Sequence, residues 1–171
     1  MSRPPETLAE RVERWLRLAR EDLLLAEHAL ADPDVVRRGA CVWAQQAAEK
    51  ALKALIVSEN TDPPKIHNLM HLERLVPAAV SEGLAPLDLE GLTRWAIEGR
   101  YPDDFEEATT TDAETAVATA AAVLLLAETA LDRAPLGDRA QEPQVDPELA
   151  LAEQQPDEPD LAPTDEHGEH R

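Results

Sequence analysis

Residues 34–59 read DVVRRGACVWAQQAAEKALKALIVSE, and this stretch sets the expected fold class. Its apolar positions recur at intervals of three and four, the period of one helix face. These positions are Val36, Ala40, Trp43, Ala47, Ala51, Ala54 and Leu55. Asp34 can cap the first turn. The pattern predicts a helix from Asp34 to about Glu59, roughly 35 to 40 Å long.

The residues before this stretch predict another long helix. Thr7 and Glu10 fit a capping box, and Pro33 supplies the stop. The apolar stripe between them runs through Leu8, Val12, Trp15, Leu16, Ala19, Leu23, Ala26 and Leu30. Because only a few residues separate the two helices, we expect them to pack antiparallel.

The residues that follow predict three more helices. Two are short, over residues 68–77 and 88–99, and end at a proline and a glycine. A long one follows the capping-box pattern of Thr111 and Glu114. The expected fold is all-α: an up-and-down helical bundle of about five helices, in which the two short helices cover one end.

The charge of the chain is strongly acidic and unevenly distributed. The 171 residues carry 16 basic and 35 acidic side chains, a formal net charge of -19. Such a field repels phosphate backbones, so non-specific nucleic-acid binding is not expected. Residues 134–171 hold 11 acidic residues against two arginines, with six of the 14 prolines. We expect a helical domain over 1–133 and a disordered, acidic, proline-rich tail over 134–171.

The cysteine content and the start of the chain predict the compartment. Cys41 is the single cysteine, so no intramolecular disulfide can form. The first residues, MSRPPETLAERVERW, contain no apolar run typical of a signal peptide or a membrane span. We therefore expect a cytoplasmic protein that does not enter a membrane.

Three segments follow one another along the chain: CVWAQQAAEKALKAL (residues 41–55), HNL (residues 67–69) and RYPDD (residues 100–104). In sequence and order they resemble the HEPN domain family, the higher eukaryotes and prokaryotes nucleotide-binding domain. The resemblance covers about residues 10–132. It implies a helical bundle that forms a homodimer and often pairs with a minimal nucleotidyltransferase, as in toxin–antitoxin systems. In some branches it also implies nucleotide binding or RNA cleavage.

The ribonuclease branches of this family carry an arginine and a histidine separated by four to six residues. That spacing is absent here, and the nearest case, Arg20 with His28, has seven residues between. A metal-independent ribonuclease needs a base for the 2′-hydroxyl and a cation for the phosphate. The sequence therefore favours a binding module over an enzyme. The alternative is a ribonuclease toxin that uses a displaced histidine such as His67 with Arg100.

The candidate binding residues lie on the second helix and on two loops. Gln46, Glu49, Lys50 and Lys53 are spaced to share one helix face, and they are joined by Lys65, His67, Arg100 and Tyr101. All three lysines of the chain fall within residues 50–65. Two interpretations stay open: a solvated helix face with a Glu49–Lys53 pair, or a site for a nucleotide or a protein partner. No other cofactor is expected.

Other polar and aromatic residues have weaker functional interpretations. His67 and His71 have the spacing of paired metal ligands, and the loop 103–107 is rich in carboxylates, yet neither set predicts a metal site. Trp15, Trp43 and Trp95 lie on apolar stripes. We expect them to anchor the core.

Overall fold

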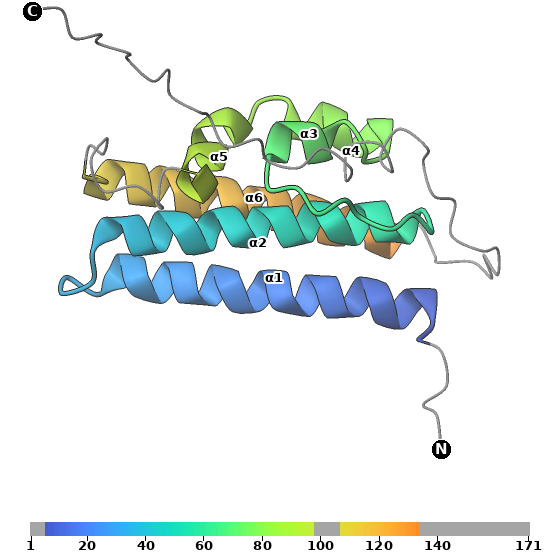
Figure 1. The fold of residues 1–171 in the computed structure, drawn as a ribbon, viewed down its shortest axis with the longest axis horizontal. Helices are drawn as coiled ribbons and strands as arrows, with labels where there is room; N and C mark the ends of the chain where they lie inside the picture. The colour runs from blue at the N-terminus through green and yellow to red at the C-terminus, as the bar shows by residue number, and fades with distance from the viewer. Residues whose placement is uncertain (1–5, 98–106, 134–171) are drawn as a thin grey trace, which may run out of the picture.

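The protein is a bundle of helices in the computed structural model, which describes residues 6–97 and 107–133. The long helices are α1 (Leu8–Ala31), α2 (Arg37–Ser58) and α6 (Thr110–Arg133). The short ones are α3 (Leu69–Glu73), α4 (Ala78–Leu84) and α5 (Leu89–Ile97). The described ranges contain no strand, so the prediction of an all-α bundle with short covering helices is confirmed (Figure 1).

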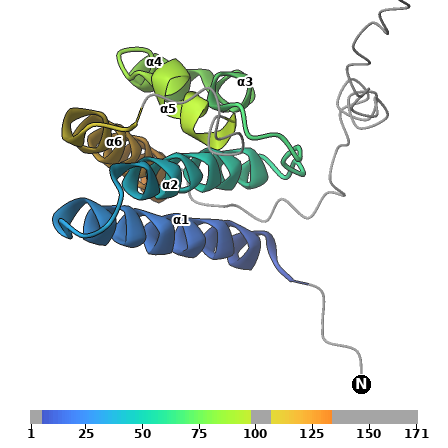
Figure 2. The same ribbon diagram turned by 60° about the vertical axis from the view of Figure 1, so that its left-hand side comes forward.

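Helix α2 lies in the middle of the bundle and packs against α1, α6, α3 and α5 (Figures 1 and 2). Every residue from position 51 to position 58 is buried. Six alanines of α2 have no exposed surface: Ala40, Ala44, Ala47, Ala48, Ala51 and Ala54. Such small side chains let the neighbouring helices approach α2 closely, which explains why this helix is rich in alanine.

Helix α1 begins and ends as the sequence predicts. The Glu10 backbone N–H donates to Thr7 Oγ1 at 3.2 Å, and the Thr7 N–H donates to Glu10 Oε2 at 2.8 Å. This is the predicted capping box, and it satisfies two backbone donors that a helix start leaves unpaired. The helix ends at Ala31, two residues before Pro33.

Helix α2 begins later than predicted, at Arg37 with Val36 as its N-cap residue. The prediction of Asp34 as the cap is wrong because residues 32–36 form the turn after α1. The Asp34 N–H donates to Asp32 Oδ1 at 2.9 Å, and Arg37 Nη1 donates to the Leu30 carbonyl at 2.8 Å. These bonds hold the turn that reverses the chain between α1 and α2.

The start of α6 also differs from the prediction by a small shift. The capping pair is Thr109 with Asp112, in place of Thr111 with Glu114. The Asp112 N–H donates to Thr109 Oγ1 at 3.1 Å, and the Thr109 N–H donates to Asp112 Oδ2 at 2.9 Å. Both pairs fit the same sequence pattern. With Thr109 as the cap, α6 begins at Thr110, and the Ala113 N–H donates to the Thr109 carbonyl at 3.2 Å.

The segment after residue 68 holds three short helices instead of the predicted two. The prediction that one helix continues to Pro77 is wrong, because α3 ends at Glu73 and the Leu75 N–H donates to the Leu72 carbonyl at 3.0 Å in the turn that follows. Pro77 is instead the N-cap of α4, a helix that the sequence pattern does not separate. Thr93 joins the covering helices, because its Oγ1 accepts from the Leu69 N–H at 3.1 Å and donates to the Leu89 carbonyl at 2.8 Å. The predicted stop at Gly99 lies outside the described residues, as do the predicted tail and the loop 100–106.

Among the described helices, α6 is long and apolar enough to cross a membrane by length and composition alone. In this structure its apolar residues Ala113, Ala120, Val123 and Ala127 are fully buried, and α6 packs against α1 and α2. This is the arrangement of a core helix of a bundle.

Candidate functional site

The carboxylate of Glu49 lies at the centre of a polar network on α2. Glu49 is only 8% exposed, Lys53 6% and Gln45 2%. Lys53 Nζ donates to Glu49 Oε1 at 2.9 Å, and Gln45 Nε2 donates to Glu49 Oε2 at 3.2 Å. Three polar side chains therefore satisfy one another within the interior of the fold, as buried polar groups must.

His67 joins this network from the segment that connects α2 to α3. Its Nδ1 lies 3.2 and 3.1 Å from the two carboxylate oxygens of Glu49. Gln45 Nε2 also donates to the His67 carbonyl at 3.0 Å. The imidazole itself is exposed, with 60% of the side-chain surface accessible. A carboxylate only accepts, so Nδ1 carries the proton and Nε2 is the acceptor of the neutral ring.

The hydrogen-bond donors around Glu49 determine its ionisation state. Burial alone would raise the pKa of this carboxyl, but hydrogen bonds from Lys53, His67 and Gln45 and the charge of Lys53 lower it below its ordinary value. Glu49 is therefore ionised at neutral pH. Its charge is shared between a buried ammonium group and an exposed imidazole.

Lys53 also contacts an aromatic ring of α1. Its Nζ lies 5.7 Å from the ring centroid of Trp15, within the range of a cation–π interaction. The sequence pattern predicts Trp15 as a core anchor, and Trp15 does pack against the core. The network around Glu49 thus spans α1, α2 and the segment before α3.

A separate ion pair joins α1 to α2. Lys50 Nζ donates to Asp22 Oδ2, and Gln46 Oε1 lies 3.5 Å from the same ammonium group. Asp22 is 6% exposed, although it lies among the apolar residues Ala19, Leu23 and Ala26 of the α1 stripe. That interruption of the stripe is the sequence signal for Asp22, which the predicted site omits.

The structure changes the interpretation of the predicted binding face. The solvated-face interpretation is wrong for Glu49 and Lys53, because the face they share is covered by α1 and by the α2–α3 segment. Lys50 and Lys53 are held by carboxylates, and Lys65 is exposed. Arg100 and Tyr101 lie outside the described residues. The network adds Gln45, which the predicted site did not include.

The predicted core role of the tryptophans holds for two of the three. Trp15 and Trp95 pack against the core, whereas Trp43 is 36% exposed. The prediction for Trp43 is wrong, because this side chain lies at the surface and does not pack against the core as the other two do. Burial raises the pKa of the neighbouring Cys41 thiol to about 11, so this cysteine stays protonated and unreactive.

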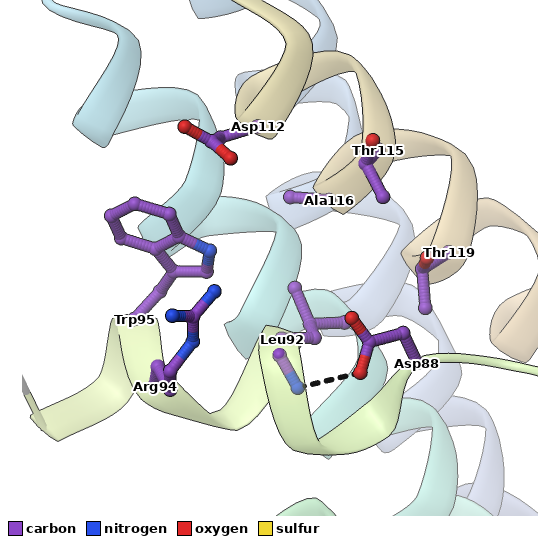
Figure 3. Close-up of a pocket in the computed structure, with 9 residues that line it drawn as sticks. Asp88, Leu92, Arg94, Trp95, Asp112, Thr115, Ala116 and Thr119 are labelled. Atoms are coloured by element: carbon purple, nitrogen blue, oxygen red, sulfur yellow. Dashed lines mark hydrogen bonds between the residues drawn. The ribbon is translucent and has the colours of Figure 1, made fainter. Parts of the chain in front are cut away.

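A small pocket lies between α5 and α6 (Figure 3). Its volume is about 70 Å³, and its polar lining includes Asp88, Arg94, Asp112 and Thr119. Asp88 Oδ1 already accepts the Gly91 N–H at 2.8 Å, the bond drawn in Figure 3. Typical ligand pockets have volumes of roughly 300 to 1,000 Å³. This pocket is therefore too small to enclose a nucleotide.

In the described part of the chain, no group of three or more histidine, cysteine, aspartate or glutamate side chains is arranged to hold a metal ion. His67 and His71 accordingly have no third ligand beside them there. The carboxylates of the loop 103–106 lie outside the described residues.

The described residues form a small α-helical bundle. It has three long helices, short covering helices and a polar network on the central helix. The model of the HEPN domain matches residues 12–130. The chain belongs to the HEPN domain family.

Two solved structures resemble this chain. TT1696 from Thermus thermophilus is 30% identical, with a TM-score of 0.57, and the match covers 71% of this chain and 98% of that one. ST0689, an archaeal HEPN homologue, is 27% identical with a TM-score of 0.54, covering 70% and 96%. The comparison with curated proteins gives no significant match.

Proposed function

We propose that this chain is a non-catalytic interaction module whose protein partner is a minimal nucleotidyltransferase, as in toxin–antitoxin pairs. The observation that carries the proposal is that the two lysines of α2 are used inside the bundle. Asp22 holds Lys50 and Glu49 holds Lys53. The bundle instead exposes large apolar side chains, among them Leu24, Val36 and Leu125.

Nucleotide binding is less favoured than protein binding as the function of this chain. A phosphate at Lys50 or Lys53 would have to displace a carboxylate that is itself nearly buried, which costs more than it gains. The α5/α6 pocket is too small to enclose a nucleotide. Protein contact through apolar side chains needs neither change.

The test is capture of the partner by the full chain. Tagged full-length protein, expressed at its natural level in its own cells, should co-purify a minimal nucleotidyltransferase in a fixed stoichiometry. The purified chain should show no binding of ATP or AMP by calorimetry at physiological salt. Recovery of the chain alone, or tight nucleotide binding without a protein partner, would contradict the proposal.

The Glu49–His67 pair favours a second candidate, the ribonuclease toxin. A buried, ionised carboxylate on Nδ1 leaves Nε2 of an exposed imidazole free to accept a proton, which is the arrangement of a general base. Under this alternative, expression of the chain alone arrests growth, and His67→Ala restores it. The exposed His71→Ala variant is the matched control and should remain toxic. Harmless expression of the wild-type chain would exclude this candidate.

A further inference from the structure

Helix α6 presents a regular row of residues to the outside of the bundle. Positions alternate at intervals of four and three along this row, which is the spacing of a seam between two helices. The row consists of Glu114, Ala118, Ala121, Leu125, Glu128 and Asp132. Leu125 is 63% exposed and Ala118 is exposed as well. Ala121 and Glu128 are partly buried, and the other four members of the row are exposed.

Helix α1 carries a matching row with the same spacing, and all of its members are exposed. The row consists of Glu13, Arg17, Arg20, Leu24, Glu27 and Ala31. Arg20 Nε donates to Glu128 Oε1 at 2.7 Å, which joins the two rows. Leu24 lies one turn after Arg20, and Leu125 lies one turn before Glu128. Because α1 and α6 run antiparallel, both leucines lie on the same side of this bond (Figure 1).

These two rows, here called the α1/α6 face, have an apolar middle and acidic surroundings. Leu24 (51% exposed), Ala118, Ala121 and Leu125 form the middle. Five carboxylates stand in the two rows against two arginines, and from residue 110 to residue 132 there is no lysine or arginine. Arg20 is already held by Glu13 and Glu128, and Arg17 by Glu21.

We propose that the α1/α6 face receives an amphipathic helix of the protein partner, with leucine-sized residues opposite Ala118 and Ala121 and lysine or arginine at its ends. The inference rests on the proposed function and names the partner segment. Alanines across a seam leave room for large side chains of the partner. Glu114 and Asp132 have no basic partner within the described residues, so cations from another chain can pair with them.

The charges of this face argue against other occupants. A second copy paired through α6 would set Glu114 against Asp132, and like charges across an interface cost energy. An anionic lipid surface attracts lysine and arginine, which this length of α6 lacks. Nucleic acid is repelled for the same reason.

Site-specific photocrosslinking in the protein's own cells tests the inference. The full-length chain carries p-benzoylphenylalanine at position 125 or, as the control, at position 82, which is exposed on α4. Position 125 should form one adduct with one other protein, and its mapped peptide should have helical apolar spacing with basic ends. An adduct with a second copy, a lipid or nucleic acid, or no discrete adduct, would overturn the inference.

Affinity measurements with the captured partner then test the two components of the face. Leu125→Ala should weaken binding about tenfold, whereas Leu125→Met should nearly retain it. Glu114→Lys with Asp132→Lys should also weaken binding about tenfold and reduce its salt dependence. Glu82→Lys with Glu90→Lys makes the same change in net charge at exposed positions of α4 and α5, and it should leave affinity unchanged.

The outcomes separate the inference from the function it rests on. If the wild-type chain captures no protein, the proposed function fails. If it captures a partner whose affinity is the same for Leu125→Ala, or is lowered equally by the control pair, the function stands and the α1/α6 face is not the docking surface.

Discussion

Glu49 is ionised in a position where burial alone would favour the neutral acid. Lys53 supplies a counter-charge from the next turn of α2, and His67 and Gln45 supply further donors. Removing one member of such a set leaves another charge buried without a partner, which costs more than the net gain from forming the pair.

Replacing Glu49 by glutamine should therefore cost about 3 kcal/mol of unfolding free energy at pH 7, because the Lys53 ammonium loses its counter-ion. The pKa of Glu49 is lowered in the folded state, so its contribution is complete above the unfolded value of about 4.3. The contribution is lost as the pH falls through the folded pKa. Urea unfolding from pH 7 to pH 3 should show a smaller acid loss for Glu49→Gln than for the wild type.

Glu21→Gln is the control for this pH series. It removes an exposed ion pair with Arg17 on the surface of α1, where a pair contributes roughly 0 to 1 kcal/mol. Its free energy of unfolding should follow the wild-type curve closely. An acid loss for Glu49→Gln as large as that of the wild type would show that Glu49 does not carry the pH dependence.

Lys50 should act on stability and not on ligand affinity. Lys50→Met leaves the carboxylate of Asp22 nearly buried and unpaired, and Asp22→Asn leaves the lysine unpaired. In the double variant neither charge remains. A double-mutant cycle by urea unfolding should give a coupling energy of about 1 to 3 kcal/mol. Strictly additive effects would mean that the two side chains do not interact in solution.

The sequence predicts the helices whose boundaries depend on local signals. Thr7 with Glu10 and Pro33 delimit α1 correctly, because a cap and a proline act on neighbouring residues. Where two signals compete, as for Thr109 and Thr111, local pattern cannot choose between them. The choice depends on which residues of α6 the rest of the bundle buries.

Some members of the candidate site could be predicted from spacing, but Gln45, Asp22 and the surroundings of the site could not. Helical spacing correctly grouped Glu49 with Lys53, and their hydrogen bond is present. Their burial results from coverage of α2 by α1, α6 and the covering helices, contacts between residues far apart in the chain. Spacing along one helix holds no information on such contacts. Spacing alone therefore could not predict that Lys50 and Lys53 pair with carboxylates within the bundle.

The alternative starts of α6 make a direct test of capping. Thr109→Ala removes the hydroxyl that accepts the Asp112 N–H, and it should cost about 1 kcal/mol. Thr111→Ala lies in the first turns of the helix, where its exposed hydroxyl has no capping role, and it should change stability by less than about 0.5 kcal/mol. Chemical unfolding compares the two. A larger loss for Thr111→Ala would assign the cap to the residue that the sequence pattern favours.

The whole molecule should be a homodimer that associates through the side of the bundle formed by α1 and α2. The exposed apolar residues there are Leu25 of α1 (44%), Val36 at the N-cap of α2 (71%) and Trp43 of α2 (36%). Exposed aromatic side chains of this kind are frequent anchors of interfaces. Sedimentation at micromolar concentration should give twice the chain mass of 18.8 kDa. Trp43→Glu should give the monomer mass, whereas Trp43→Phe should remain dimeric.

A wild-type mass near 18.8 kDa would contradict this assignment. A dimeric Trp43→Glu variant would move the interface to another surface. The helical signal of the Trp43→Glu variant in circular dichroism should equal that of the wild type, since Trp43 is not part of the buried core.

The close packing around α2 also determines which positions of the chain tolerate substitution during evolution. Ala47, Ala51 and Ala54 have no exposed surface, so each added methylene would push neighbouring helices apart. Exposed positions outside the α1/α6 face have no such limit. Related chains should therefore differ first at those positions and last in the middle of α2, so that sequence similarity between distant relatives persists longest in this helix.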